Sequence, residues 1–270
     1  MNPRSLALFG LGTTYKCLED IEIYGNISQS YRAINFSDVR VTNDNLLVDS
    51  NLVDEDGWTA DIGLRGKIFR NAVTIDASGF VMMYNNRIGL TQRAINNTTI
   101  RLIRTNIGDA RFIGLEVFEE LSLLNLFETK KDWNFTSFNN VAIVDARYMP
   151  GTEKSFENNR VENVPLLNVK SGLSFTYKDF SIGAQLNHVS EQYTDASNAE
   201  FYPNATIGVI PSFTIIDLSS KYQWKYLSLA ASINNLTDQI YFTRRATGYP
   251  GPGIIPAQRR MFFFTVGAKF

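Results

Sequence analysis

Apolar residues recur at every second position through much of this sequence. The clearest runs are Phe262, Phe264, Val266, Ala268 and Phe270 at the end, Leu227, Leu229, Ala231 and Ile233 before them, and Trp58, Ala60, Ile62 and Leu64 nearer the start. Successive side chains of a β-strand point to opposite faces, so each run gives a strand with one apolar and one polar face. No stretch combines helical apolar spacing with capping residues at both ends. The sequence predicts an all-β protein.

Eleven long strands are predicted, and their connections fall into two length classes. The strands span 4–16, 20–32, 57–68, 73–86, 109–124, 133–148, 165–178, 180–193, 212–223, 226–236 and 259–270. Short turns lie at 17–19, 69–72, 179 and 224–225, long segments at 33–56, 87–108, 149–164, 194–211 and 237–258, and an intermediate link at 125–132. Because short and long connections alternate, antiparallel pairing places all the short ones at one end of the strands.

The alternation alone leaves two architectures open, a soluble β-sandwich and an antiparallel transmembrane β-barrel. A sandwich buries its apolar faces, whereas a barrel turns them toward lipid and lines its lumen with polar residues. The strands exceed the ~5–6 residues common in globular sheets and match the ~9–11 that cross a bilayer obliquely. Aromatic residues also gather near the predicted strand ends, as in interfacial girdles: Trp58, Tyr84, Trp133, Tyr148, Tyr193, Trp224, Tyr226 and Tyr241. These features favour the barrel.

Composition excludes several other classes. The 26 Lys and Arg residues nearly balance 27 Asp and Glu residues, which argues against a nucleic-acid partner. The single Cys17 and single His188 exclude a disulfide framework and a multi-histidine or cysteine metal site, so no metal ligand is assigned. The neighbouring carboxylates Glu119 and Glu120 point to opposite faces of a strand and cannot act as a glycosidase pair.

Several segments resemble one known family. Residues 234–245 (NNLTDQIYFTRR) resemble the penultimate-strand signature of TonB-dependent outer-membrane receptors, and 248–253 and the final strand closing on Phe270 fit the same family. Residues 24–32 are similar to a family strand ending in Ser-x-(Gly/Ser)-(Phe/Tyr)-Arg, and 57–67 and 84–88 to the hairpin that follows it. The resemblance covers essentially all 270 residues and is greatest to the ferric-citrate subclass of siderophore receptors.

The resemblance implies a plugged barrel of about 22 strands in the bacterial outer membrane, with periplasmic short turns and extracellular long loops. Eleven strands are half of that ring, so residues 1–270 are expected to be the C-terminal part of the barrel, without the plug and the N-terminal strands. Such a half-ring would expose two strand edges to lipid, so we expect a fragment that is not competent alone.

The resemblance also implies function and partners. It implies a receptor that moves a ferric chelate and is not an enzyme, with no cofactor beyond that transported ligand. The partners expected are TonB through the absent plug, membrane lipid, lipopolysaccharide, and the barrel assembly machinery. The terminal aromatic Phe270, together with Phe264 and Phe262, matches what that machinery is expected to recognise.

Charge is distributed unevenly among the long segments. Segment 33–56 carries six acidic residues against Arg40 alone, whereas 87–104 carries four arginines and no acid. Arginine offers a fixed fork of donors suited to carboxylates. We therefore predict that an anionic chelate such as ferric citrate is bound by loop residues Arg87, Arg93, Arg101, Arg104, Arg244, Arg245 and Tyr249. Lipopolysaccharide phosphates or plain solvation of the loops are the alternatives for these arginines.

Other functions remain open from the sequence. The same barrel could import an oligosaccharide, cobalamin or another metal chelate, and Phe201, Tyr202 and Tyr249 would suit stacking on a sugar. A secreted β-sandwich adhesin is the alternative outside transport.

Charged residues on the polar strand faces, such as Asp61, Arg65 and Lys67, are expected to form ladders across the lumen wall.

Overall fold

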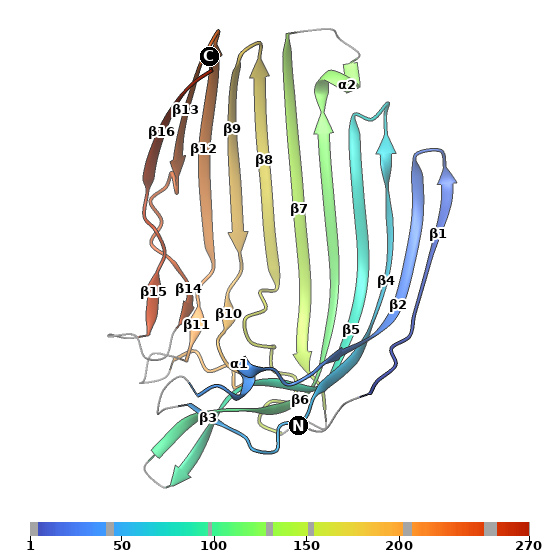
Figure 1. The fold of residues 1–270 in the computed structure, drawn as a ribbon, viewed down its shortest axis with the longest axis vertical. Helices are drawn as coiled ribbons and strands as arrows, with labels where there is room; N and C mark the ends of the chain where they lie inside the picture. Colours follow the sequence, from blue (N-terminus) through green and yellow to red (C-terminus); the bar gives the residue numbers. More distant parts are fainter. Residues whose placement is uncertain are drawn as a thin grey trace.

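The computed structural model describes residues 5–41, 46–96, 99–127, 132–150, 154–201, 207–245 and 253–269. One antiparallel sheet dominates this part of the chain (Figure 1). Its strands, in order across the sheet, are β1 (Gly10–Leu18), β2 (Ile21–Arg32), β4 (Glu55–Ile68), β5 (Val73–Asn96), β6 (Thr99–Ser122), β7 (Trp133–Tyr148), β8 (Leu167–Tyr177), β9 (Phe180–Val189), β12 (Phe213–Trp224), β13 (Leu227–Asn234) and β16 (Met261–Ala268). The predicted all-β class and the eleven long strands are confirmed.

The remaining elements are short. Strand β3 (Leu46–Val48) pairs in parallel with β6, and two small sheets join β10 (Gln192–Tyr193) to β11 (Val209–Ile210) and β14 (Phe242–Arg245) to β15 (Ile254–Pro256). The helices are α1 (Phe36–Val39) and α2 (Leu123–Phe127). Within the described ranges, no helix is long and apolar enough to cross a membrane.

The connections sort by length, as the sequence predicts. The turns β1–β2, β4–β5, β8–β9 and β12–β13 lie with α2 at one end of the strands, the short-turn end, and the C-terminus lies there too (Figure 1). The long connections, with α1, β3, β10, β11, β14 and β15, lie at the opposite long-loop end.

The prediction of a long loop over 87–108 is wrong. Strands β5 and β6 are 24 residues each and continue as one hairpin beyond their neighbours (Figure 1). A register shift between Tyr84 and Arg87, with Asn86 at φ 55°, interrupts the ladder before pairing resumes. Such a bulge bends the strand and shifts its alternation, so one continuous pattern of parity is lost there. The first strand, predicted over 4–16, begins at Gly10 and ends at Leu18.

The register keeps one apolar and one polar face across the sheet. On the apolar face Phe262 and Phe264 are each 71% exposed, and Ile62 is 67% exposed. On the polar face a hollow of about 630 Å³ spans β7 to β16, with Asp217 and Lys221 among its lining residues. The apolar face is therefore turned outward, whereas a β-sandwich would bury it in a core.

Aromatic rings lie across glycines on the polar face. Gly63, Gly114 and Gly172 are the direct cross-strand partners of Tyr24, Phe80 and Phe138. A Cβ atom on these glycines would lie only 2.4, 2.4 and 2.2 Å from the facing ring. Glycine lets each ring pack flat against the neighbouring strand, the arrangement in which an aromatic covers a strand glycine. Of the three rings, Phe138 lies in the wall of the hollow.

A ladder of polar residues interrupts the apolar face midway along β7 and β8. Glu119, Asn139 and Ser171 lie opposite one another on β6, β7 and β8. The Asn139 side-chain amide donates to Glu119 Oε2 over 2.6 Å, and the Ser171 hydroxyl donates to Asn139 Oδ1 over 2.8 Å. Each polar side chain of this ladder has a partner, which lowers the cost of placing it among apolar neighbours.

Replacing Asn139 by Leu should destabilise the membrane-inserted protein by about 1–3 kcal/mol, because Glu119 and Ser171 lose their shared partner. Ser137→Leu is the matched control, since Ser137 lies on the same face of β7 between Leu121 and Leu173. Thermal unfolding followed by heat-modifiable gel mobility measures both. Equal unfolding temperatures for the two variants would show that the ladder contributes nothing.

Candidate ligand-binding site

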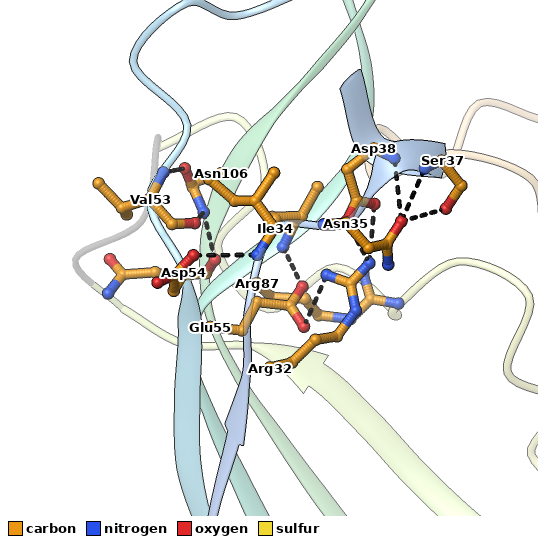
Figure 2. A network of polar contacts seen from close by, with 12 residues as sticks. Arg32, Ile34, Asn35, Ser37, Asp38, Val53, Asp54, Glu55, Arg87 and Asn106 are labelled. Atoms are coloured by element: carbon orange, nitrogen blue, oxygen red, sulfur yellow. Dashed lines mark hydrogen bonds and ion pairs between the residues drawn. The ribbon is translucent and has the colours of Figure 1, made fainter. Parts of the chain in front are cut away.

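The acidic β2–β4 connection is fixed to the sheet through Arg32, at the end of β2 (Figure 2). Its guanidinium donates to both carboxylate oxygens of Asp38 over 2.7 and 2.8 Å, and lies 3.2 Å from Glu55 Oε2. Glu55 Oε1 also accepts the backbone N–H of Ile88 over 2.5 Å. Asp38 and Glu55 are 5% and 6% exposed, so both carboxylates depend on these donors.

Helix α1 is held by its own cap and by β6. Asn35 accepts the N–H groups of Ser37 and Asp38, while Asp38 accepts the N–H of Asn35, which completes a capping box. Arg104 of β6 donates to the carbonyl oxygens of Ser37 and Asp38. The acidic segment thus packs on the arginine-bearing hairpin through Arg104, while its acids Asp38 and Glu55 form ion pairs with Arg32 of β2.

Arg87 belongs to a second buried network. It donates to Glu162 Oε1 over 2.6 Å and to the Tyr148 hydroxyl over 3.3 Å, and that hydroxyl donates to Glu162 Oε2 over 2.7 Å. Burial opposes the charge of Arg87, but the facing Glu162 carboxylate outweighs it and raises the pKa of the guanidinium. Burial, followed by the Glu162 charge, raises the pKa of the Tyr148 hydroxyl, which stays protonated. Arg87 therefore positions the loops around it.

Asp195 is a buried carboxylate near this network, in the β9–β12 connection. Its Oδ2 accepts from the N–H and the hydroxyl of Ser197 over 3.3 and 2.8 Å, while Oδ1 has no partner among the described residues. Burial raises the pKa of this carboxyl above its usual range, with a smaller contribution from the charge of Glu162. The protonated form is favoured relative to an exposed aspartate.

Arg93 and Arg101 lie directly opposite one another on the β5–β6 hairpin. Arg93 is exposed and Arg101 half-buried, and the described residues supply neither guanidinium with an ion pair or hydrogen bond. The charge of Arg93 reaches Asp49, whose pKa is lowered first by the Asn51 N–H and the Thr105 hydroxyl and to a smaller extent by Arg93. Two cations in direct cross-strand register repel each other, so the pair favours an anion.

The two arginines of β14 differ from each other. Arg244 is exposed, whereas Arg245 donates to the carbonyl oxygen of Val209 over 2.9 Å and lies over the Phe242 ring. Burial lowers the pKa of Arg245. Tyr249 lies outside the described residues. Among the predicted residues, the hairpin therefore brings Arg93 and Arg101 together, while β14 holds Arg244 in a separate sheet.

A sequence profile described as "TonB dependent receptor-like, beta-barrel" matches residues 3–236. The chain belongs to the TonB-dependent receptor family. Members of this family are outer-membrane β-barrel proteins, and they are receptors and transporters rather than enzymes. The predicted family, fold and outer-membrane location are confirmed. The short-turn end is therefore periplasmic and the long-loop end extracellular.

Solved structures of similar fold come from proteins with different cargoes. The ferric citrate transporter FecA in its unliganded form aligns with 22% identity and a TM-score of 0.75, over 96% of this chain and 37% of FecA. The siderophore receptor PiuA from Acinetobacter baumannii aligns with 21% identity and a TM-score of 0.68, over 97% of this chain and 35% of PiuA. The copper transporter OprC aligns with 18% identity and a TM-score of 0.69, over 97% of this chain and 39% of OprC. The chain thus spans well under half of each of these proteins. No curated protein sequence matches the chain.

Other predicted residues lie as follows. Phe262 and Phe264 are on the apolar face of β16, Phe270 lies outside the described residues, and the role of all three in barrel assembly stays a prediction. On the lumen wall Arg65 pairs with Glu22 and Asp61 accepts from Asn26, so the ladders exist as contacts between neighbouring strands. The His188 Nδ1 atom lies 2.8 Å from the Thr214 hydroxyl.

The two buried ion networks were missed by sequence reasoning. Arg87 and Glu162 are 75 residues apart in the chain, and no local pattern connects them. Arg32 ends the segment that carries the family resemblance, but its partners Asp38 and Glu55 are found only once the β2–β4 connection is folded.

Breaking the Arg87–Glu162 pair should destabilise the loops strongly. Arg87→Met leaves Glu162 buried without its cation, and we expect a loss of about 3–5 kcal/mol. Arg259→Met is the matched control, because Arg259 pairs with Asp238 at an exposed position and should change stability little. Chemical unfolding and limited proteolysis of the long loops measure the effect. Similar losses in both variants would refute a special role for the buried pair.

Loop closure around Asp195 should weaken as pH rises. An acid whose pKa is raised by folding stabilises the folded loop when protonated, and that contribution is lost as pH climbs from the ordinary carboxyl range through the raised pKa. Hydrogen-exchange protection of the Ala196 N–H, which donates to the Leu90 carbonyl, reports this equilibrium. In Asp195→Asn the protection should no longer fall with pH.

Asp238 supplies a control in which hydrogen-exchange protection should depend on pH in the opposite direction. Hydrogen bonds from Arg259 and from the Arg260 N–H hold the pKa of Asp238 well below its usual range. Protection of the Arg260 N–H should therefore persist at neutral pH and fall as pH falls toward that lowered pKa. The same pH trend at both sites would contradict these assignments.

Proposed function

We propose that this chain forms half of the transmembrane ring of a receptor that imports an anionic ferric chelate, energised through TonB. The observation that carries the cargo class is the cross-strand pair Arg93 and Arg101, placed at the extracellular end without an ion-pair partner among the described residues. Carboxylates of a chelate such as ferric citrate would be held by forked charge-assisted hydrogen bonds. The similar fold of the ferric citrate transporter FecA is compatible with this cargo.

The structure narrows which predicted arginines we propose for ligand contact. We propose ligand contact for Arg93, Arg101 and Arg244, which lie at the extracellular end, with Tyr249 retained from the sequence. Arg87, Arg104 and Arg245 are engaged by Glu162, by the carbonyls of α1 and by Val209. We propose that these three act by positioning the hairpin and loops. No resident cofactor is proposed, since iron would arrive within the chelate as cargo.

The proposal that this chain forms half of a ring is based on the two edge strands of the sheet. Among the described residues β1 pairs only with β2, and β16 only with β13. Unpaired strand edges are not stable in hydrocarbon, and plugged transporters of this kind have about 22 strands. We propose that further strands complete the ring and that a plug domain contacts TonB, with insertion by the barrel assembly machinery. The assembled receptor below means the membrane-inserted protein that contains this chain.

A different cargo is the second candidate. The copper transporter OprC and the siderophore receptor PiuA align with nearly equal TM-scores, so the fold is compatible with several cargoes. Phe201, 75% exposed on the extracellular side, would suit stacking on a sugar. The cargo is decided by the loop side chains and therefore by binding measurements.

Ferric citrate binding to the assembled receptor tests the proposal. Arg93→Gln with Arg101→Gln should weaken binding by about tenfold or more, because each arginine contributes a charge-assisted contact. Arg259→Gln removes an arginine that is already paired with Asp238 and should leave affinity unchanged. Unchanged affinity in the double variant would reject the ferric citrate site, and tighter binding of an uncharged oligosaccharide would favour the second candidate.

A further inference from the structure

Three arginines lie in one row across the outward, apolar face of the sheet. Arg111 of β6 is the direct cross-strand partner of Arg147 of β7, and Arg147 forms an isolated antiparallel bridge with Arg160 of the β7–β8 connection. Directly opposite residues in an antiparallel pair put their side chains on the same face, with Cβ atoms about 5 Å apart. Val161, next to Arg160, is buried in the core on the polar side, so Arg160 points outward with the other two.

The level of this row in the membrane follows from its neighbours. The same row continues through Met83 to Trp58, which is 39% exposed. Toward the periplasmic end the next outward residues include Ile113 and Leu115, 46% and 48% exposed. Toward the extracellular end they are polar, with Asn85 bonded to Asp56. Tryptophan favours the interface, so the arginines lie where the apolar band meets the extracellular headgroup region.

Most of the donors of these arginines have no partner among the described residues. Arg147 donates through Nε to Asp145 over 2.9 and 3.1 Å, and through Nη1 to the Asn158 carbonyl over 2.9 Å. The side chains of Arg111 and Arg160 have no hydrogen bond or ion pair within the described part of the chain, and Arg111 Nε is buried without a partner. Asp109 lies on the same face but accepts the N–H of Asn86.

We propose that Arg111, Arg147 and Arg160 bind a phosphate group on the headgroup of an outer-leaflet glycolipid. Three adjacent cations repel one another. Among the described residues Asp145 forms an ion pair only with the central one, and Asp109, two residues from Arg111 on the same face of β6, adds a second carboxylate that is not ion-paired with the row. A phosphate offers several acceptor oxygens and matches the arginine fork bidentately. A lipid source is favoured over a soluble anion because the row borders exposed aliphatic side chains, against which acyl chains would pack. This inference depends on the membrane placement and is independent of the cargo.

Native mass spectrometry of the delipidated assembled receptor tests the site, with bisphosphorylated lipid A as the probe. Arg111→Gln with Arg160→Gln should weaken binding by about tenfold or more, since two charge-assisted contacts are lost. Arg160→Lys, which keeps the charge, should lose less than Arg160→Gln. The matched control is Lys178→Gln with Lys225→Gln, which removes two exposed cations at the periplasmic turns and should leave lipid A binding unchanged.

Two further arms identify the source of the phosphate. Lipid A stripped of its phosphates should bind the unmodified receptor about as weakly as bisphosphorylated lipid A binds the double variant. Inorganic phosphate at equal concentration should not displace lipid A; equal displacement would mean a soluble-anion site and would overturn the lipid assignment. Unchanged binding in the double variant would overturn the site itself.

Folding is checked by heat-modifiable gel mobility of each variant. If the double variant does not fold, Arg160→Gln decides alone, because no described contact of its side chain is lost. Ferric citrate binding should be the same in all of these variants. The lipid site and the proposed cargo therefore fail by different measurements.

Discussion

The rest of this structure depends on the continuous pairing of backbone groups from β1 to β16. In hydrocarbon no water can satisfy an N–H or a C=O, so a membrane-spanning strand must be paired along its length. The ladder meets this requirement through eleven strands, and it also fixes which side chains share a face. A shift of one residue would carry Phe262 and Phe264 into the lumen and Phe263 and Thr265 into lipid. Pairing and alternation thus specify the same register.

The extracellular end is built by different forces, because water is available there. Its loops fold onto the polar face and bury a small core with Ile107, Tyr148 and Val161. Two arginines of this region form ion pairs with buried acids. Arg87 pairs with Glu162, and Arg32 pairs with Asp38 and Glu55. A buried cation without its acid would cost several kcal/mol, so these pairs fix loop positions. Arg104 and Arg245 are held instead by backbone carbonyls, so Arg93 and Arg101, which have neither kind of partner among the described residues, are the ones we propose for a ligand.

Local pattern was sufficient to predict most of the sheet. The strand predicted over 133–148 is β7 at Trp133–Tyr148, and the one predicted over 57–68 is β4 at Glu55–Ile68, because alternation is a local signal. The outer half of the β5–β6 hairpin gave no such signal. Its one face packs Leu90 and Leu102 near Ile207, a loop residue distant in the chain, and its other face carries Arg93 and Arg101.

The candidate site was predictable only in residue type. Arginine-rich segments were evident, but which arginines are engaged depends on acids that the fold brings from elsewhere. Arg104 contacts carbonyl groups 66 and 67 residues away in the chain, and such contacts have no sequence spacing to recognise. The outward parity of Arg111 and Arg147 follows from the predicted strands, whereas Arg160 joins them only because the β7–β8 connection returns to pair with β7.

The polar residues on the apolar face fall into two groups: those that form hydrogen bonds with one another, and those that have no partner among the described residues. On this face Glu119 and Ser171 have apolar neighbours on both sides along their strands, Asn139 lies between Ser137 and Val141, and the three form hydrogen bonds with one another. Arg111 and Arg160 lie at the extracellular border of that face, and the described residues give their side chains no partner. Polar groups inside hydrocarbon need partners from the protein, because lipid tails offer none. At the border of the hydrocarbon, lipid headgroups can supply the partner. Cations without a protein partner are therefore tolerated there, and we propose that these arginines bind headgroups.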